Sequence, residues 1–327
     1  MIKLATIGTS WITEAFLLGC QLLKNKFKLT AVYSRDYQKG LKFGSKFGCE
    51  KVICNLEELA NDPTIEAVYI ASPNAFHYSQ SKLMLEHKKH VICEKPITVT
   101  PKELEELLAL SKQNGVVYME ALIARHLPAW NIMQDTIKHL GRISHARFDF
   151  SQRSTKYDGY VKGEHQNIFD PKMCTGALMD LGIYCIYPAL GWFGDVNIVY
   201  SFCRKLSTGA DGEGGAVLHF SDLTAELTWS KTGETRIGSE IIGENGTIVL
   251  PSISKMTNIK LILKDGTVET LTDEPDKPTL MSYEANDFYR YITDYQNYKA
   301  DLDSANELAL KVSQLMFKIR KQSGIEF

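Results

Sequence analysis

The sequence lacks the features that mark several large classes of protein. It has no run of lysine or arginine, and its 37 basic and 39 acidic residues leave a formal net charge of −2 at pH 7. Proteins whose main partner is nucleic acid or an anionic membrane usually carry clustered positive charge. No apolar stretch approaches the roughly 20 residues of a membrane span. Because the strand-like segment Lys3–Ile7 begins almost at once, we expect no signal peptide. We therefore expect a cytoplasmic protein that binds neither nucleic acid nor membrane.

Metal-binding and disulfide patterns are missing as well. The seven cysteines are odd in number, none belongs to a Cys-x-x-Cys motif, and the eight histidines are scattered along the chain. Zinc sites need closely spaced ligands, and a disulfide framework needs an even set of partners. We therefore expect reduced thiols and no metal site.

The first 120 residues alternate short apolar segments with helical ones. With 327 residues, 44% of them hydrophobic, the chain can form two domains with separate cores. The alternation predicts an α/β Rossmann domain, a doubly wound parallel sheet, over residues 1–120. Its strands are expected at Lys3–Ile7, Leu29–Ser34, Ala67–Ala71, Val91–Cys93 and Val116–Glu120.

From residue 121 onward, strands accumulate with little helix between them. Ala225–Trp229 alternates apolar and polar residues as a strand buried on one face does, and Asn245-Gly246 is a hairpin signal. We therefore predict an α+β domain with a large, mostly antiparallel open sheet over residues 121–327, closed by helices around Tyr283–Tyr298 and Ser304–Gln322. The expected strands are 143–152, 196–204, 216–220, 223–230, 236–242, 247–250 and 259–263.

A glycine turn follows the first strand. Gly8-Thr9-Ser10-Trp11-Ile12-Thr13 leads into an apolar segment of helical period. Strand, glycine turn and helix form the context of a dinucleotide fingerprint, although Ser10 and Thr13 replace its second and third glycines. Free N–H groups and the helix dipole would favour a pyrophosphate at this point. An ordinary turn between strand and helix is the alternative.

The second strand is followed by Ser34-Arg35-Asp36. An acidic residue at this place usually binds the ribose hydroxyls of NAD, whereas an arginine suits the 2′-phosphate of NADP. Arg35 therefore favours NADP, and Asp36 keeps NAD possible. A solvated turn is the alternative.

Two further turns carry polar residues. Asn74 is expected to cap a helix over His77–Glu86, and a capped helix with a surface histidine is the plain alternative. Glu94-Lys95-Pro96 follows the strand Val91–Cys93 directly, where open α/β sheets bind their ligands. A lysine there can polarise an oxygen or transfer a proton. A structural Glu94–Lys95 pair is the alternative.

One predicted helix, Gly176–Pro188, lies among the strands of the second domain. Asp180 and Tyr184 are four residues apart, so they share one face of this otherwise apolar helix. Buried polar groups need partners. The pair indicates either a functional site or a core tyrosine whose hydroxyl is satisfied locally.

Taken together, these motifs resemble the Gfo/Idh/MocA family of oxidoreductases over nearly the whole chain. Tyr184 stands where many members carry histidine, which is similar to the branch that contains dihydrodiol dehydrogenase and glucose–fructose oxidoreductase. Asn167 departs from the arginine that relatives often have there. The motifs that carry the resemblance are Ser72-Pro73-Asn74 with His77, Val91–Pro96, Tyr118–Ala121 with Arg125, Gly176–Tyr184 and Ile242–Ile248.

The resemblance implies an NAD(P)-dependent dehydrogenase that moves a hydride between the nicotinamide and a hydroxyl or carbonyl carbon of a sugar, polyol or dihydrodiol. Lys95 would polarise the oxygen, Tyr184 would exchange the proton, and Asp180 would orient Lys95 or the substrate; either Lys95 or Tyr184 could make the formal transfer. The alternative is a non-catalytic regulator that senses dinucleotide. The implied cofactor-binding residues are Gly8, Thr9, Ser10, Trp11, Ile12, Ser34, Arg35, Ser72, Pro73, Asn74, His77, Glu94, Lys95 and Arg125.

Family members commonly assemble through the exposed face of the second sheet. The resemblance therefore implies a homodimer or a higher homo-oligomer. We expect that face to carry aromatic residues such as Trp229 and Phe220 or their neighbours. The second domain would thus bind substrate and mediate dimerisation.

Overall fold

The computed structural model describes residues 1–327, which divide into two compact units. The first unit contains Met1–His126 and Asp276–Leu310, and the second contains Leu127–Pro275 and Lys311–Phe327. The predicted division differs from this one, because it assigned everything after residue 120 to the second domain. The pattern along a helix shows which face is buried but not which domain covers that face.

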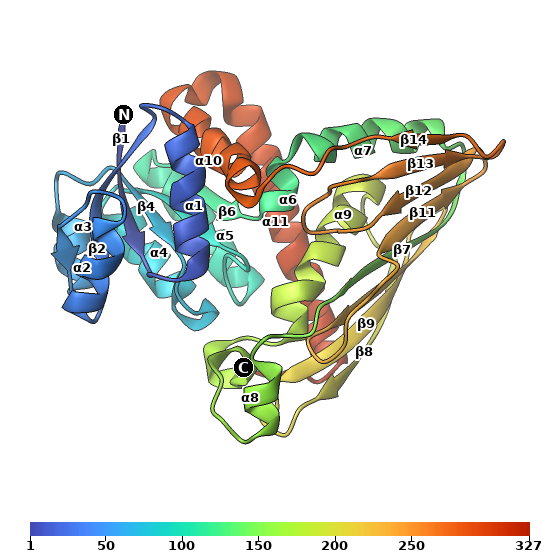
Figure 1. The fold of residues 1–327 in the computed structure, drawn as a ribbon, viewed down its shortest axis with the longest axis horizontal. Coiled ribbons are helices and arrows are strands. Elements are labelled where there is room, and N and C mark those ends of the chain that lie inside the picture. Colours follow the sequence, from blue (N-terminus) through green and yellow to red (C-terminus); the bar gives the residue numbers. More distant parts are fainter. The chain divides into compact units, whose positions relative to one another are not determined.

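The first unit is built on six parallel strands in the order β3-β2-β1-β4-β5-β6 (Figure 1). This sheet confirms the predicted doubly wound α/β class. The two-residue strand β3 was not predicted, because it is too short to show a period. The strands are β1 (Ile2–Ile7), β2 (Phe27–Tyr33), β3 (Val52–Ile53), β4 (Ala67–Ile70), β5 (His90–Glu94) and β6 (Tyr118–Ala121).

Helices connect these strands, and α10, which comes much later in the chain, packs against α1. Gly19 lies so close to the later helix, α10, that an added Cβ would be 2.8 Å from the backbone carbon of Met281. This close contact explains why residues 276–310 belong to the first unit. The helices are α1 (Trp11–Leu22), α2 (Tyr37–Ser45), α3 (Leu56–Asn61), α4 (His77–Glu86), α5 (Pro101–Asn114), α6 (Ile123–His126), α10 (Lys277–Thr293) and α11 (Tyr295–Gln322), which continues into the second unit.

The helix α4 begins differently from the prediction. Asn74 opens a single 3₁₀ turn, Asn74–Phe76, instead of capping α4, and the α-helix starts at His77. His77 is also not a surface residue, because its side chain is completely buried. The ring of His77 is buried because its two nitrogens contact the backbone carbonyls of Ser72 and Pro96.

The second unit is built on an eight-stranded sheet in the order β14-β13-β12-β11-β7-β10-β9-β8. Only β7 and β10 run parallel, so the sheet is mostly antiparallel, as predicted. The three-residue strand β14 was not predicted. The strands are β7 (Ile143–Ser151), β8 (Ile198–Lys205), β9 (Asp211–His219), β10 (Thr224–Ser230), β11 (Ser239–Gly243), β12 (Gly246–Leu250), β13 (Lys260–Leu263) and β14 (Val268–Thr270).

Helical segments of the second unit lie between and before these strands. Pro171–Phe193 has the length and composition of a membrane span, but 78% of its apolar 18-residue stretch is buried inside the protein. This burial is typical of a core helix, and the expectation that no stretch approaches such a length was wrong. The segments are α7 (Pro128–His139), α8 (Tyr157–Val161), the 3₁₀ turns Asn167–Phe169 and Pro171–Met173, a π-helical segment (Leu178–Gly182) and α9 (Ile183–Phe193).

The aromatic residues expected on the outer face of the second sheet are in fact buried. Trp229 is 1% exposed and packs on Gly182, where an added Cβ would be 2.8 Å from the indole. Phe220 packs edge-on against Phe193. Trp229 is in phase with the buried positions of β10, so its strand period directs it inward. The exposed aromatics are their neighbours on the edge strand β8, Tyr200 (59% exposed) and Phe202 (62%).

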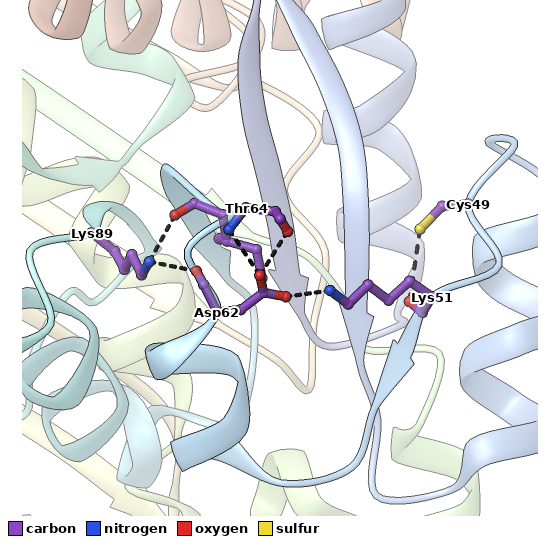
Figure 2. A network of polar contacts seen from close by, with 6 residues as sticks. Cys49, Lys51, Asp62, Thr64 and Lys89 are labelled. Carbon is purple, nitrogen blue, oxygen red and sulfur yellow. Dashed lines mark hydrogen bonds and ion pairs between the residues drawn. The ribbon is translucent and has the colours of Figure 1, made fainter.

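A polar network links the segments that precede β3, β4 and β5 in the first unit (Figure 2). Lys51 and Thr64 both donate hydrogen bonds to the carboxylate of Asp62. Lys89 donates to the backbone carbonyls of Asp62 and Ile65, at 2.7 and 2.8 Å. Burial opposes ionisation of Asp62, but the hydrogen bonds from Lys51 and Thr64 outweigh it and lower its pKa to about 2. The ionised carboxylate therefore stabilises the fold.

We predict that Asp62→Asn lowers the free energy of unfolding at pH 7 by about 1–2 kcal/mol, because charged hydrogen bonds are lost. The native pKa of Asp62 lies below that of an ordinary aspartate, so its contribution is complete above about pH 4 and disappears as the pH falls toward 2. Urea unfolding from pH 7 to pH 3 measures this difference. Glu105→Gln, which removes one exposed charge from the same unit, is the control. A difference between wild type and Asp62→Asn that does not change with pH would contradict the role assigned to the carboxylate.

Candidate active site

The turn after β1 requires a glycine and leaves a helix end open. Gly8 has φ +115°, and an added Cβ would be 2.7 Å from the carbonyl oxygen of Ala71. Ser10 precedes α1 in extended conformation, but its side chain makes no capping hydrogen bond. The first N–H groups of α1 are therefore open to an anion. Trp11, the first residue of the helix, is 72% exposed.

The turn after β2 separates the arginine from the aspartate. Asp36 caps α2, because its carboxylate accepts a hydrogen bond of 3.0 Å from the backbone of Lys39. Ser34 is buried, and its hydroxyl accepts a bond from the backbone of Asp36. Arg35 is exposed. The Asp36 carboxylate thus caps the helix, and the exposed Arg35 has no such capping role.

A buried histidine joins the turns after β4 and β5. The two ring nitrogens of His77 lie 2.8 Å from the carbonyl oxygens of Ser72 and Pro96. Burial lowers the pKa of His77, although the two carbonyls favour the charged ring. The hydroxyl of Ser72 donates to Gln80 at 2.7 Å. His77 therefore holds the Ser72 and Pro96 loops together from the protein interior.

Lys95 follows β5, next to the half-buried carboxylate of Glu94. The hydroxyl of Tyr69 donates a 2.5 Å hydrogen bond to Glu94. Burial raises the pKa of Glu94, against the opposing effects of Tyr69 and Lys95. Glu284 on α10 is fully buried, and burial and repulsion from Glu94 raise its pKa well above the ordinary value. Lys95 is half-buried and directly follows Glu94 in the chain. No signal in the sequence marked Glu284, because it lies far along the chain on a helix with no recognisable motif.

Two polar residues, one in β6 and one in the short helix α6 that follows it, are held by contacts within the protein. Glu120 is buried and accepts a 2.7 Å bond from the backbone of Ile97. Arg125 contacts Asp301 at 3.2 Å, and the hydroxyl of Tyr291 donates to the other oxygen of that carboxylate at 2.6 Å. Arg125, proposed from the resemblance as a cofactor-binding residue, thus has a partner on α11.

The predicted residues of the second unit lie on one helical face. Between Ala177 and Leu190, Asp180 and Tyr184 are the only side chains that are not buried. Asp180 belongs to the π-helical segment and Tyr184 to the first turn of α9. The ring of Tyr184 packs edge-on against Phe150 with centroids 5.4 Å apart. Tyr184 is therefore not a fully buried core tyrosine, and the two polar groups share the accessible face. Short π-helical segments are frequent at functional sites.

A lysine that the sequence analysis missed contacts Asp180. The ammonium of Lys231 donates to Asp180 Oδ2, and its side chain is only 2% exposed. Lys231 directly follows β10 and is in phase with Ala225, Leu227 and Trp229, the buried positions of that strand. A lysine at a core-facing position needs a partner. This phase was the signal that could have identified Lys231.

The residues of the first unit fit a dinucleotide. Gly8, Ser34, Ser72 and Lys95 follow β1, β2, β4 and β5, and parallel strands end at the same edge of their sheet. The N-terminus of α1 can accept the pyrophosphate, the close approach at Gly8 leaves no room for a side chain, and Arg35 can accept a phosphate. Lys95 belongs to the first unit, whereas Asp180 and Tyr184 belong to the second.

Comparison with protein families agrees with this arrangement. The model of the GFO_IDH_MocA family, described as an oxidoreductase family with an NAD-binding Rossmann fold, matches residues 2–122. The model of the GFO/IDH/MocA C-terminal domain matches residues 136–249. Together the two matches cover most of the chain.

Individual proteins are similar over the full length. The scyllo-inositol 2-dehydrogenase (NADP(+)) IolU of Bacillus subtilis (strain 168) is 37% identical, and the alignment covers 100% of this chain and 98% of that protein. The trans-1,2-dihydrobenzene-1,2-diol dehydrogenase of Danio rerio is 27% identical, with 97% and 95% covered. Levoglucosan dehydrogenase, solved with NADH and levoglucosan, has the same fold, with a TM-score of 0.85, 19% identity and coverage of 99% and 97%.

We predict that the protein binds NADP(H) more tightly than NAD(H), and that Arg35→Ala weakens NADP(H) binding about 10- to 150-fold. This range corresponds to the loss of a charged hydrogen bond of roughly 1.5–3 kcal/mol. NAD(H), which has no 2′-phosphate, should bind almost as before. Fluorescence titration measures both constants, and Lys42→Ala, which removes an exposed cation from α2, is the control. Equal affinity of the wild-type protein for the two cofactors would contradict the assignment.

Proposed function

We propose that this chain, which belongs to the Gfo/Idh/MocA family of NAD(P)-dependent oxidoreductases, oxidises a ring hydroxyl of a cyclic polyol or sugar, or reduces the matching ketone. The single observation that carries the proposal is the accessible face of the helix in the second unit. Among its buried neighbours, only Asp180 and Tyr184 reach solvent. A protein that merely sensed dinucleotide would have no need for a carboxylate and a phenol presented in this way.

The chemistry requires a proton to leave the hydroxyl while a hydride leaves the carbon. The bound nicotinamide supplies the hydride acceptor or donor. The site then needs a proton-exchanging group and a positive charge near the oxygen. We assign the charge to Lys95 at the end of β5 and the proton exchange to Tyr184, with Asp180 as the orienting carboxylate. The two residues Lys95 and Tyr184 act as one unit in this scheme.

The cofactor in this proposal is NADP(H), bound by the first unit. Support comes from the open N-terminus of α1, the exposed guanidinium of Arg35 and the commitment of Asp36 to helix capping. Further support comes from the NADP(+)-dependent relative at 37% identity. The turns after β4 and β5 complete this site, and His77 fixes them from inside.

The substrate class follows from the same relative and from the polar site. We propose cyclic polyols first, because scyllo-inositol is the substrate named for the relative that matches the whole chain. Sugars and dihydrodiols are the next class to test, since relatives named for such substrates share the fold or the family. Reduction of NADP by purified protein in the presence of scyllo-inositol, myo-inositol, levoglucosan and a trans-dihydrodiol tests the class directly. Tight cofactor binding without turnover of any of them would favour the dinucleotide-sensing alternative.

We predict that Tyr184→Phe lowers kcat about 10²- to 10⁴-fold without changing cofactor affinity, because it removes a proton-exchanging hydroxyl and keeps the ring. Lys95→Ala should lower kcat by a similar factor. Residues that act as a unit lose function non-additively, so the double variant should be little slower than the slower single variant. Steady-state kinetics of the three variants measures these effects.

The matched control is Tyr187→Phe, one turn further along the same helix. Tyr187 is 2% exposed and does not lie on the accessible face, so its variant should retain kcat. If Tyr184→Phe retained a near-normal kcat and only lost stability, Tyr184 would be a structural residue and the assignment would be wrong.

We also propose that two copies associate through the outer face of the second sheet. The edge strand β8 exposes Ile198, Tyr200 and Phe202, and large exposed apolar residues that lie together mark interaction surfaces. Toward the middle of the same face, Arg147 pairs with Glu240 at 3.3 Å. An apolar edge beside a paired polar centre suits a contact between identical copies.

We predict a homodimer or a larger homo-oligomer at micromolar concentration, and a shift toward monomer in Phe202→Asp, because the new charge would be desolvated at the contact. Light scattering measures the mass. Leu22→Asp, which places a charge at an exposed apolar position of the first unit, should leave the mass unchanged. A monomeric wild-type protein would refute the proposed assembly.

A further inference from the structure

We propose that Lys231 is a positioning residue of the reaction, which holds and orients the Asp180 carboxylate from inside the second unit. This inference rests on the proposed function, because it assigns a role to Lys231 only through Asp180. Neither the sequence motifs nor the resemblance indicated Lys231.

The contact joins a buried cation to an accessible anion. The ammonium of Lys231 donates to Asp180 Oδ2. The side chain of Lys231 is 2% exposed, whereas that of Asp180 is 32% exposed. The lysine therefore approaches the carboxylate from the protein interior, and part of the carboxylate remains accessible. A contact of this kind fixes the orientation of the carboxylate without covering it.

The backbone of Lys231 is held on both sides. Its N–H donates to the carbonyl of Gly212 at 2.8 Å, and its carbonyl accepts from the N–H of Ser154 at 2.9 Å. The preceding residue, Ser230, is paired with both β9 and β7. Lys231 thus extends from a strand at the middle of the sheet, and rigid elements position functional groups more accurately than loops do.

A second carboxylate near Lys231, that of Asp211 on β9, is buried and contacts the start of the same helix. Asp211 is completely buried, and its Oδ2 accepts a 2.7 Å bond from the backbone of Leu178. Gly176 lies so close that an added Cβ would be 1.9 Å from Asp211 Oδ1. Burial raises the pKa of Asp211 to about 6, and hydrogen bonds from the backbone and the positive charge of Lys231 oppose this rise. The residues around the π-helical segment therefore bring two acidic side chains near one buried ammonium.

A purely structural role explains this arrangement less well. Replacing a buried ion pair by apolar residues is often neutral or stabilising, so such a pair is weak evidence for stability. A pair that served only the core would also have both partners buried, whereas Asp180 lies on the accessible face with Tyr184. The lysine is placed where it can act on the proposed active site without contacting substrate.

The test compares Lys231→Met, Lys231→Gln and Lys231→Arg with wild type and Asp180→Asn in the full-length protein, with the best polyol or sugar substrate found for the wild type. We expect Lys231→Met and Lys231→Gln to lower kcat about 10- to 100-fold while NADP(H) affinity stays within a factor of about two, because residues that orient a functional side chain by a hydrogen bond typically contribute this much. Lys231→Arg, which keeps the cation, should recover a measurable part of kcat. Lys264→Met, at an exposed lysine in the turn between β13 and β14, is the control.

A double variant, Lys231→Met with Asp180→Asn, separates positioning from structure. Because Lys231 acts through Asp180, the double variant should have nearly the kcat of Asp180→Asn alone. If Lys231→Met and Lys231→Gln retained wild-type kcat per folded molecule, or if the two losses multiplied, the inference would be overturned while the proposed function stood. If neither the wild-type protein nor Asp180→Asn turned over any of the substrates, the proposed function would fail, and the inference would fail with it. Should Lys231→Met not fold, the comparison of Lys231→Gln with Lys231→Arg gives the same decision.

Discussion

Parallel strands end at the same edge of their sheet, and the candidate site of the first unit depends on this constraint. Because β2, β1, β4 and β5 are neighbours in the sheet, turns that are distant in sequence reach one edge. Arg35 and Lys95 are 60 positions apart in numbering, yet both follow strands of this group. The buried contacts of His77 and Glu94 then hold the turns in place. The parallel sheet thus brings these turns to one edge, and a few polar side chains behind them hold the turns in position.

In the second unit, an otherwise apolar helix carries polar side chains on its accessible face, and contacts with the sheet support them. Each buried polar group must have a partner, and the partners here come from the strands. Lys231 reaches Asp180 from the end of β10, and Asp211 on β9 accepts from the helix start at Leu178. Gly182 allows the helix to approach Trp229 closely. The sheet therefore supports the accessible face that carries Asp180 and Tyr184.

The sequence predicted the elements with a clear period and failed where contact between distant segments decides the outcome. Most strands of the two sheets follow from local patterns, and the structure has them, whereas the very short β3 and β14 show no period. The grouping of residues 276–310 with the first unit does not follow from a local pattern, because the close contact at Gly19 links distant parts of the chain. Trp229 was expected outside, although its own strand period directs it inward. Lys231 was missed because a lysine is ordinarily taken as a surface residue.

The central claim is that this protein transfers a hydride directly between the nicotinamide of NADP(H) and a carbon of a small polyol or sugar. The most direct measurement is the reduction of the ketone product with NADPH that carries deuterium at the transferring position of the nicotinamide, followed by mass spectrometry of the alcohol. The account predicts one deuterium bound to the former carbonyl carbon in each molecule of alcohol, and none in the solvent. An alcohol without deuterium, or a protein that binds NADPH and never consumes it, would contradict the account.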